Sequence, residues 1–222
     1  MTAAILFFLS LSVAFPILVG FFRWRIIKRL YTPIMVAFCL GILVEIITRY
    51  ALTSNQINWV LGNNFWILCE SVIIPLQFSV WTAGARRKRL YYILIGILVL
   101  GWVMEHLILG SVQEMHPYFR MSYSLVNVLL SINMINYLVI HEDKKMVRQP
   151  IFIICTAFII FFTYQLVYEG VFAIISNLDI TTKTNLNTVF SIINSICNLL
   201  YGIALLLVPT GHIDWLDEKN KE

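Results

Sequence analysis

Charged residues are scarce along most of this chain. Asp, Glu, Lys and Arg together make up 13% of its 222 residues, whereas 59% of the residues are hydrophobic. A soluble domain carries about 25% charged residues and a lower apolar content. The composition therefore excludes an ordinary soluble domain and indicates a chain whose solvent is the lipid bilayer.

The sequence motifs of soluble enzymes are also missing. The chain has no glycine-rich phosphate loop, no GxSxG and no HExxH. Its four cysteines lie far apart inside apolar runs and form no CxxC pair, so we expect buried apolar side chains rather than disulfides or metal ligands. We predict no cofactor and no catalytic residues, although an outer metal site built from Glu105, His106 and His116 stays conceivable.

Apolar runs of membrane length repeat along the chain. Each run can cross the ~30 Å hydrocarbon layer as a helix rising about 1.5 Å per residue. The sequence therefore predicts an all-α, polytopic membrane protein, with one seven-transmembrane helix bundle over residues 1–209 and a short tail over residues 210–222. The predicted helices cover residues 2–22, 31–53, 61–83, 90–111, 118–141, 150–175 and 185–208.

The basic residues are distributed unevenly between the two ends of these helices. Of the 16 Lys and Arg residues, 13 fall on alternate connections and in the tail. Because positive charge accumulates on the cytoplasmic side, this bias predicts an external N-terminus and a cytoplasmic C-terminus. Membrane topology explains the net charge of +4, so we predict the lipid bilayer as a partner and no nucleic acid.

Four glutamates interrupt the apolar runs. A carboxylate costs about 2.5–3.5 kcal/mol or more at the centre of a membrane helix, so such residues indicate a function or a buried partner. Helical rise places Glu45, Glu70, Glu105 and Glu169 roughly 9–14 Å from the outer ends of their helices. Arg49 follows Glu45 by one helical turn, which predicts a structural ion pair between these two residues.

Other polar side chains repeat on single helix faces. Asn63, Glu70 and Gln77 are each seven residues apart, and Gln165 precedes Glu169 by four. Because lipid cannot satisfy their amides, these faces should point into the bundle. We predict an outward-side ligand site there, while interhelical hydrogen bonds without further role are the alternative. The candidate residues are Asn63, Glu70, Gln77, Glu105, His106, Asn127, Gln165, Glu169 and Asn194.

Residues 63–89, NNFWILCESVIIPLQFSVWTAGARRKR, have a polar beginning, a proline in the middle and a basic end. This run resembles the third span of the seven-helix membrane sensor regions of bacterial histidine kinases. The resemblance implies a multi-pass protein of the bacterial cytoplasmic membrane. No kinase or other output domain follows within the 222 residues, so a signal would pass to a separate protein. The last apolar run has no lysine, which excludes retinal attachment there as in microbial rhodopsins.

These features lead to a ranked set of functional hypotheses. The first is a sensor or receptor-like module that binds a small polar or cationic ligand, or protons, and signals to a cytoplasmic or membrane partner. The second is a small-solute or proton-coupled transporter that uses the same carboxylates. An intramembrane enzyme acting on lipid and a structural subunit of a larger complex are further alternatives.

Overall fold

The computed structural model describes residues 9, 11–52, 56–82, 84–114, 116–141, 148–175 and 179–209. For residues 48–52, 56–59 and 141 it describes the backbone alone. All regular structure in these ranges is helical, as predicted. The elements are η1 (Leu11–Val13), α2 (Ala14–Phe22), α3 (Trp24–Leu52), α4 (Gln56–Trp81), α5 (Ala85–Val103), the π-helical η2 (Met104–Leu109), α6 (Pro117–His141), α7 (Pro150–Ile174) and α8 (Ile180–Leu207).

Six helical stretches are long and apolar enough to cross a membrane. They are α3, α4, α5 continued by η2, α6, α7 and α8, so the chain has the build of a multi-pass membrane protein. The first predicted helix is described only from Leu11 to Phe22, which is shorter than a membrane span. The tail, residues 210–222, lies outside the described residues.

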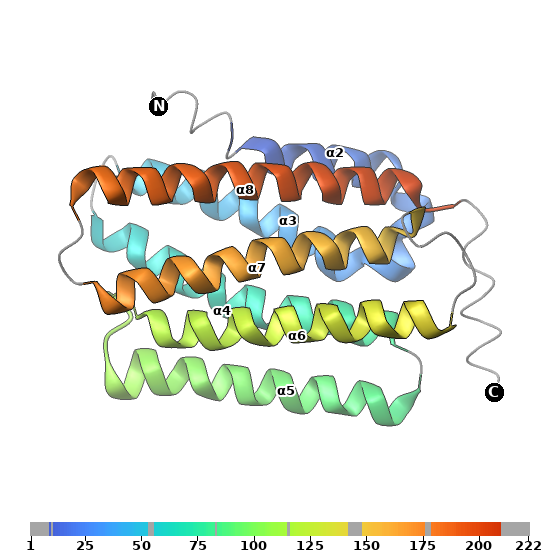
Figure 1. Cartoon of the computed structure of the whole chain (residues 1–222), viewed down its shortest axis with the longest axis horizontal. Coiled ribbons are helices and arrows are strands. Elements are labelled where there is room, and N and C mark those ends of the chain that lie inside the picture. Colours follow the sequence, from blue (N-terminus) through green and yellow to red (C-terminus); the bar gives the residue numbers. More distant parts are fainter. Residues whose placement is uncertain are drawn as a thin grey trace.

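The helices lie side by side along one common direction (Figure 1). Helix α6 packs on α7, α7 packs on α8, α8 packs on α2, and α3 packs on α4. Helix α5 forms one edge of the bundle in this view, and α2 with α8 forms the opposite edge. Apolar side chains of α5 point outward in the way expected of a lipid-facing helix, for example Leu90, Ile93, Ile97 and Leu100.

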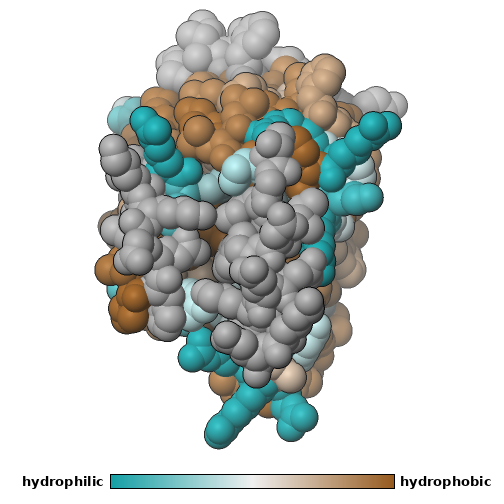
Figure 2. All heavy atoms as spheres, turned by 90° about the vertical axis from the view of Figure 1, so that its right-hand side faces the viewer, coloured by the Kyte–Doolittle hydropathy of each residue, from teal (hydrophilic) through white to brown (hydrophobic). Residues whose placement is uncertain are grey.

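Basic side chains gather at one end of the bundle, which we call the basic end. It contains the turn between α2 and α3 and the turn between α4 and α5, where Arg23, Arg25, Arg86 and Lys88 lie. Figure 2 looks onto this end and shows hydrophilic side chains around its rim. The basic runs that alternate along the sequence thus lie together at one end of the structure. That this end faces the cytoplasm stays a prediction.

Several helices begin earlier than the sequence predicts. Helix α3 begins at Trp24 instead of residue 31, because the basic run that follows contains good helix formers and no breaker before Pro33. Helix α8 begins at Ile180 instead of residue 185, because Asp179 caps it by accepting a hydrogen bond from Thr182 N at 3.1 Å. Hydrogen bonds from Thr182 lower the pKa of the Asp179 carboxyl.

Candidate functional site

Arg120 is the centre of the buried polar contacts. It lies in the first turn of α6 and is 5% exposed. Its Nη1 lies 3.2 Å from Oε1 of Glu169 on α7, which is equally buried. Its Nη2 donates to Oδ1 of Asn64 on α4 at 3.0 Å, and the Asn63 amide, turned so that its oxygen faces Arg120, accepts from the same guanidinium. One arginine therefore joins α4, α6 and α7.

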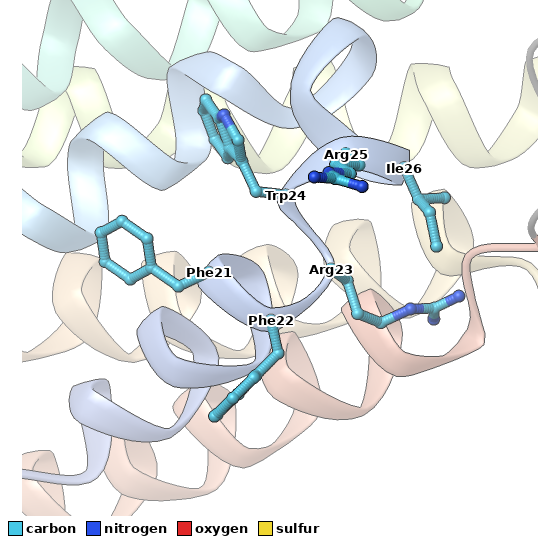
Figure 3. A pocket seen from close by; sticks show the side chains of 6 residues that line it. All are labelled: Phe21, Phe22, Arg23, Trp24, Arg25 and Ile26. Atoms are coloured by element: carbon cyan, nitrogen blue, oxygen red, sulfur yellow. The ribbon is translucent and has the colours of Figure 1, made fainter.

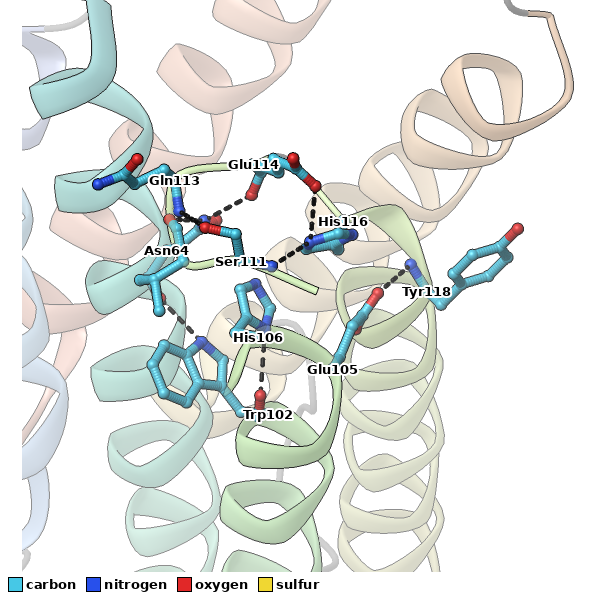
Figure 4. A network of polar contacts seen from close by, with 10 residues as sticks. Asn64, Trp102, Glu105, His106, Ser111, Gln113, Glu114, His116 and Tyr118 are labelled. Atoms are coloured by element: carbon cyan, nitrogen blue, oxygen red, sulfur yellow. Dashed lines mark hydrogen bonds and ion pairs between the residues drawn. The ribbon is translucent and has the colours of Figure 1, made fainter. Parts of the chain in front are cut away.

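Asn64 extends this network to the connection between η2 and α6. Its Nδ2 donates to the carbonyls of Val112 and Glu114 at 2.8 and 2.9 Å. Its own carbonyl accepts from Nε1 of Trp102 on α5 at 3.1 Å (Figure 4). The side chain of Asn64 thus binds the connection after η2 to α4, and its backbone carbonyl binds α5 to α4. All three hydrogen bonds are buried or partly buried.

Glu105 has a structural role in the described fold. At the beginning of α6, one of its carboxylate oxygens accepts from Tyr118 N at 3.1 Å (Figure 4), and the other accepts from Phe119 N at 2.5 Å. Pro117 opens that helix and has no N–H, so Glu105 satisfies the next two of the free amides that every helix N-terminus has. Its predicted contact with a ligand stays a prediction.

His106 packs against aromatic rings and a second histidine. Its ring stacks on Trp102 with centroids 4.8 Å apart, and its Nδ1 lies 3.1 Å from the Trp102 carbonyl oxygen. The ring of His116 meets it edge to face at 5.5 Å, while His116 Nε2 accepts from Ser111 N at 3.3 Å. Within the described ranges, no three His, Cys, Asp or Glu side chains are grouped so that they could hold a metal ion.

Several buried polar atoms on α6 and α7 have no hydrogen-bond partner among the described residues. Four of them are on the inner faces of α6 and α7: Tyr123 Oη, Ser124 Oγ, Asn127 Oδ1 and Gln165 Oε1. The fifth is Nε of Arg120 itself. Buried polar groups are nearly always paired, and leaving one unpaired costs about 1–3 kcal/mol. This cluster therefore has unused capacity to bind a polar ligand or water.

Glu70 faces the same cluster from α4. Its carboxyl is close to the Tyr123 hydroxyl and interacts electrostatically with Arg120 and with Tyr201 of α8. Aromatic rings surround this region: Tyr123 meets Phe162 at 5.4 Å between centroids, and Tyr201 meets Phe158 at 5.5 Å. The Glu70 residue as a whole is half-buried, whereas these four aromatic neighbours are buried.

Gln77 binds the backbone of α3. Its Nε2 donates to the Leu30 carbonyl at 2.6 Å, and its Oε1 accepts from Ile34 N at 3.0 Å. Trp81 Nε1 donates to the same Leu30 carbonyl at 3.1 Å. Leu30 and Ile34 flank Pro33, which disturbs the normal helical hydrogen bonds. Gln77 thus supplies partners to backbone groups on both sides of the proline, and both of its amide atoms are used.

The remaining predicted residues have different positions. Asn127 is buried and donates to the Tyr123 carbonyl at 3.1 Å, within α6. Asn194 on α8 is half-buried. The predicted ion pair between Glu45 and Arg49 cannot be located, because the Arg49 side chain lies outside the described residues.

Of the predicted residues, the structure places Asn63, Glu70 and Glu169 around Arg120, while Gln165 and Asn127 lie one and two helical turns farther along α7 and α6. It adds residues that sequence reasoning missed, namely Asn64, Tyr123 and Ser124. A weak signal for Asn64 was its place beside Asn63, and Ser124 shares a helix face with Arg120 and Asn127 because it lies four residues after one and three before the other. Comparisons with protein-family models, curated proteins and solved structures found no match to this chain.

The cap that Glu105 forms on α6 leads to a first prediction. We expect Glu105→Ala to lower the free energy of unfolding by about 1–2 kcal/mol, because two amide groups at the N-terminus of α6 lose a charged acceptor. Unfolding by denaturant in detergent, followed by circular dichroism, measures this change. Glu114→Ala is the control: this side chain is exposed and lies 3.7 Å from His116, so a change within about 0.5 kcal/mol is expected. Equal effects of the two substitutions would contradict the capping role.

Proposed function

We propose that this protein is a membrane sensor or receptor-like module that binds a small cation or protons between its helices, toward the end of the bundle opposite the basic end. The central polar site, as we define it, consists of Glu70, Arg120, Tyr123, Ser124, Asn127, Gln165 and Glu169. The observation that carries the proposal is the group of buried polar atoms there that have no partner in the described structure.

The charge balance of the central polar site favours a positive ligand. Glu70 and Glu169 both interact with the single guanidinium of Arg120. One arginine can neutralise one carboxylate, so a second carboxylate in this apolar surrounding needs a proton or a cation. The rings of Tyr123 and Tyr201 also present π-systems that favour a cation.

The same contacts offer a route from binding to a change in structure. Arg120 holds Glu169 of α7 and Asn64 of α4 at hydrogen-bonding distance. A ligand that competes for Glu169 or attracts Arg120 toward Glu70 would alter contacts of three helices at once. The basic end lies at the other end of α6 and α7, where a separate signalling protein could read a change in helix position.

Ligand-dependent stability tests this proposal. The purified protein is heated with a panel of small cations, including ammonium, choline and polyamines, and over a range of pH. We expect at least one cation or a pH change to shift the unfolding temperature of the wild type, and Glu70→Gln to remove that shift. Glu114→Gln, a matched change at an exposed loop position, should retain it. A wild type that responds to neither the cations nor pH would refute the proposal.

One observation favours transport as the second candidate. Arg120, Ser124, Asn127 and Ser131 are all buried along one face of α6. These residues span roughly 16 Å of helix length and could form part of a polar path. Cation or proton flux into proteoliposomes separates the two functions, because a sensor binds its ligand without net flux.

A further inference from the structure

A second candidate site lies at the basic end, away from the central polar site. The turn between α2 and α3 lines an open hollow of about 510 Å³. We call it the turn hollow, and its lining residues are Phe21, Phe22, Arg23, Trp24, Arg25 and Ile26 (Figure 3). Two of these six residues are cationic and three are aromatic, which is a composition typical of a membrane–water interface.

The two arginines of the turn hollow have different roles. The Arg23 guanidinium donates to the carbonyls of Leu205 at 2.9 Å, Leu206, and Val208 at 2.5 Å, at the end of α8. These carbonyls are among the free acceptors that every helix C-terminus has, so Arg23 is occupied as a cap. Figure 3 shows its side chain directed toward that helix.

Arg25, in contrast, has no partner among the described residues. Its side chain is exposed and lines the hollow within two residues of Arg23. A guanidinium presents several donors in a planar fork that matches the oxygens of a phosphate group. Among the described residues, Arg25 is therefore the guanidinium of the turn hollow that stays available to a phosphate group.

Exposed apolar side chains at the end of α2 line the same hollow. Phe22 is 89% exposed and Phe21 is 63% exposed, both at the end of α2. Leu18, one turn before Phe22, is 56% exposed and extends the apolar face along the helix. Such large exposed rings are unfavourable in water but favourable among lipid chains near the headgroup layer. A ligand that meets both Arg25 and these rings has a phosphate group and an apolar part.

We propose that the turn hollow binds an anionic phospholipid, with its phosphate at Arg25 and its acyl chains along Leu18, Phe21 and Phe22. This lipid would stand beside the Arg23 cap and would stabilise the packing of the α2–α3 turn against the end of α8. The proposal depends on the bundle lying in a membrane and is independent of any ligand at the central polar site.

Lipid binding by single-residue variants tests this site. Delipidated protein in neutral detergent is titrated with phosphatidylglycerol or phosphatidylcholine, and bound lipid is counted by native mass spectrometry. We expect tighter binding of phosphatidylglycerol, and Arg25→Gln should weaken it by about fivefold, since one basic residue near an anionic surface contributes about 1 kcal/mol. Arg25→Lys keeps the positive charge but replaces the planar guanidinium, so we expect a loss of lipid affinity between those of the wild type and Arg25→Gln.

Arg86→Gln is the matched control. Arg86 is also exposed at the basic end, but it begins α5 at the opposite edge of the bundle, and we expect unchanged lipid binding. Equal losses for the Arg25 and Arg86 variants would overturn the site in favour of diffuse charge attraction, and no loss for either would overturn it as well. A competition experiment with inorganic phosphate distinguishes the two sources of a phosphate group. If millimolar phosphate displaces phosphatidylglycerol, the site recognises free phosphate and the lipid assignment is wrong.

Discussion

Arg120→Met is expected to destabilise the bundle more than any other single substitution considered. The change removes the partner of Glu169 and of Asn64 and leaves a carboxylate in the protein interior. Breaking a buried ion pair in this way costs about 3–5 kcal/mol. For a chain of this size, the loss corresponds to a decrease of roughly 6–20 °C in the unfolding temperature. Thermal unfolding in detergent, followed by circular dichroism, measures it.

A double variant separates the unpaired charge from the loss of packing. The double variant Arg120→Met/Glu169→Met contains neither charge of the ion pair. We therefore expect it to regain much of the stability that Arg120→Met alone loses. Arg86→Met removes the same type of side chain from an exposed position and should change stability by no more than about 0.5 kcal/mol. If Arg120→Met behaved like Arg86→Met, the guanidinium would not join α4, α6 and α7 as the structure shows.

Gln77→Leu is expected to have the second largest effect. The substitution removes the amide group of Gln77, which donates to the Leu30 carbonyl. It also removes the only side-chain acceptor that the described structure gives to Ile34 N. An unsatisfied buried backbone group costs about 1–3 kcal/mol, and Trp81 can still satisfy the Leu30 carbonyl. We therefore expect a loss of about 1–3 kcal/mol in the free energy of unfolding, measured by denaturant titration in detergent.

The proline explains this role of Gln77 and supplies a second variant. In a Pro33→Ala background, α3 regains an N–H and can form its regular hydrogen bonds around residues 30–34, so Gln77→Leu should cost less there. Gln113→Leu is a matched change at an exposed position of the connection after η2 and should be nearly neutral. An equal cost of Gln77→Leu with and without Pro33 would contradict the proposed support of the interrupted helix.

Local patterns in the sequence predicted the elements well because they depend on nearby residues alone. Membrane-length apolar runs predicted six helices that the structure contains, and Pro150 opens α7 as expected of a proline at a helix beginning. The beginnings of α3 and α8 were harder to predict. Helix formation continues past the edge of the apolar run until a cap or a break ends it, as at Asp179.

The composition of the central polar site was only partly predictable. Faces repeating every three to four residues identified Gln165 and Glu169 as one group, and the structure places Glu169 against Arg120. Gln77 and Glu105 carried the same polar signal, yet one binds the backbone of α3 and the other caps α6. A polar side chain inside an apolar run needs a partner, but the sequence does not state whether that partner is a ligand, another side chain or a free backbone group.

The sequence by itself determined that this protein is a bundle of membrane-length helices with acidic residues inside it, because hydropathy and helical period are properties of each segment alone. Only the tertiary structure decided that Arg120 joins Glu169 to Asn64 and that Glu105 and Gln77 satisfy backbone groups. It also decided that Tyr123, Asn127 and Gln165 each have a buried atom without a partner in the described part of the chain. The physical reason is that these contacts connect residues up to 56 positions apart, and their formation depends on the rotation and offset of packed helices.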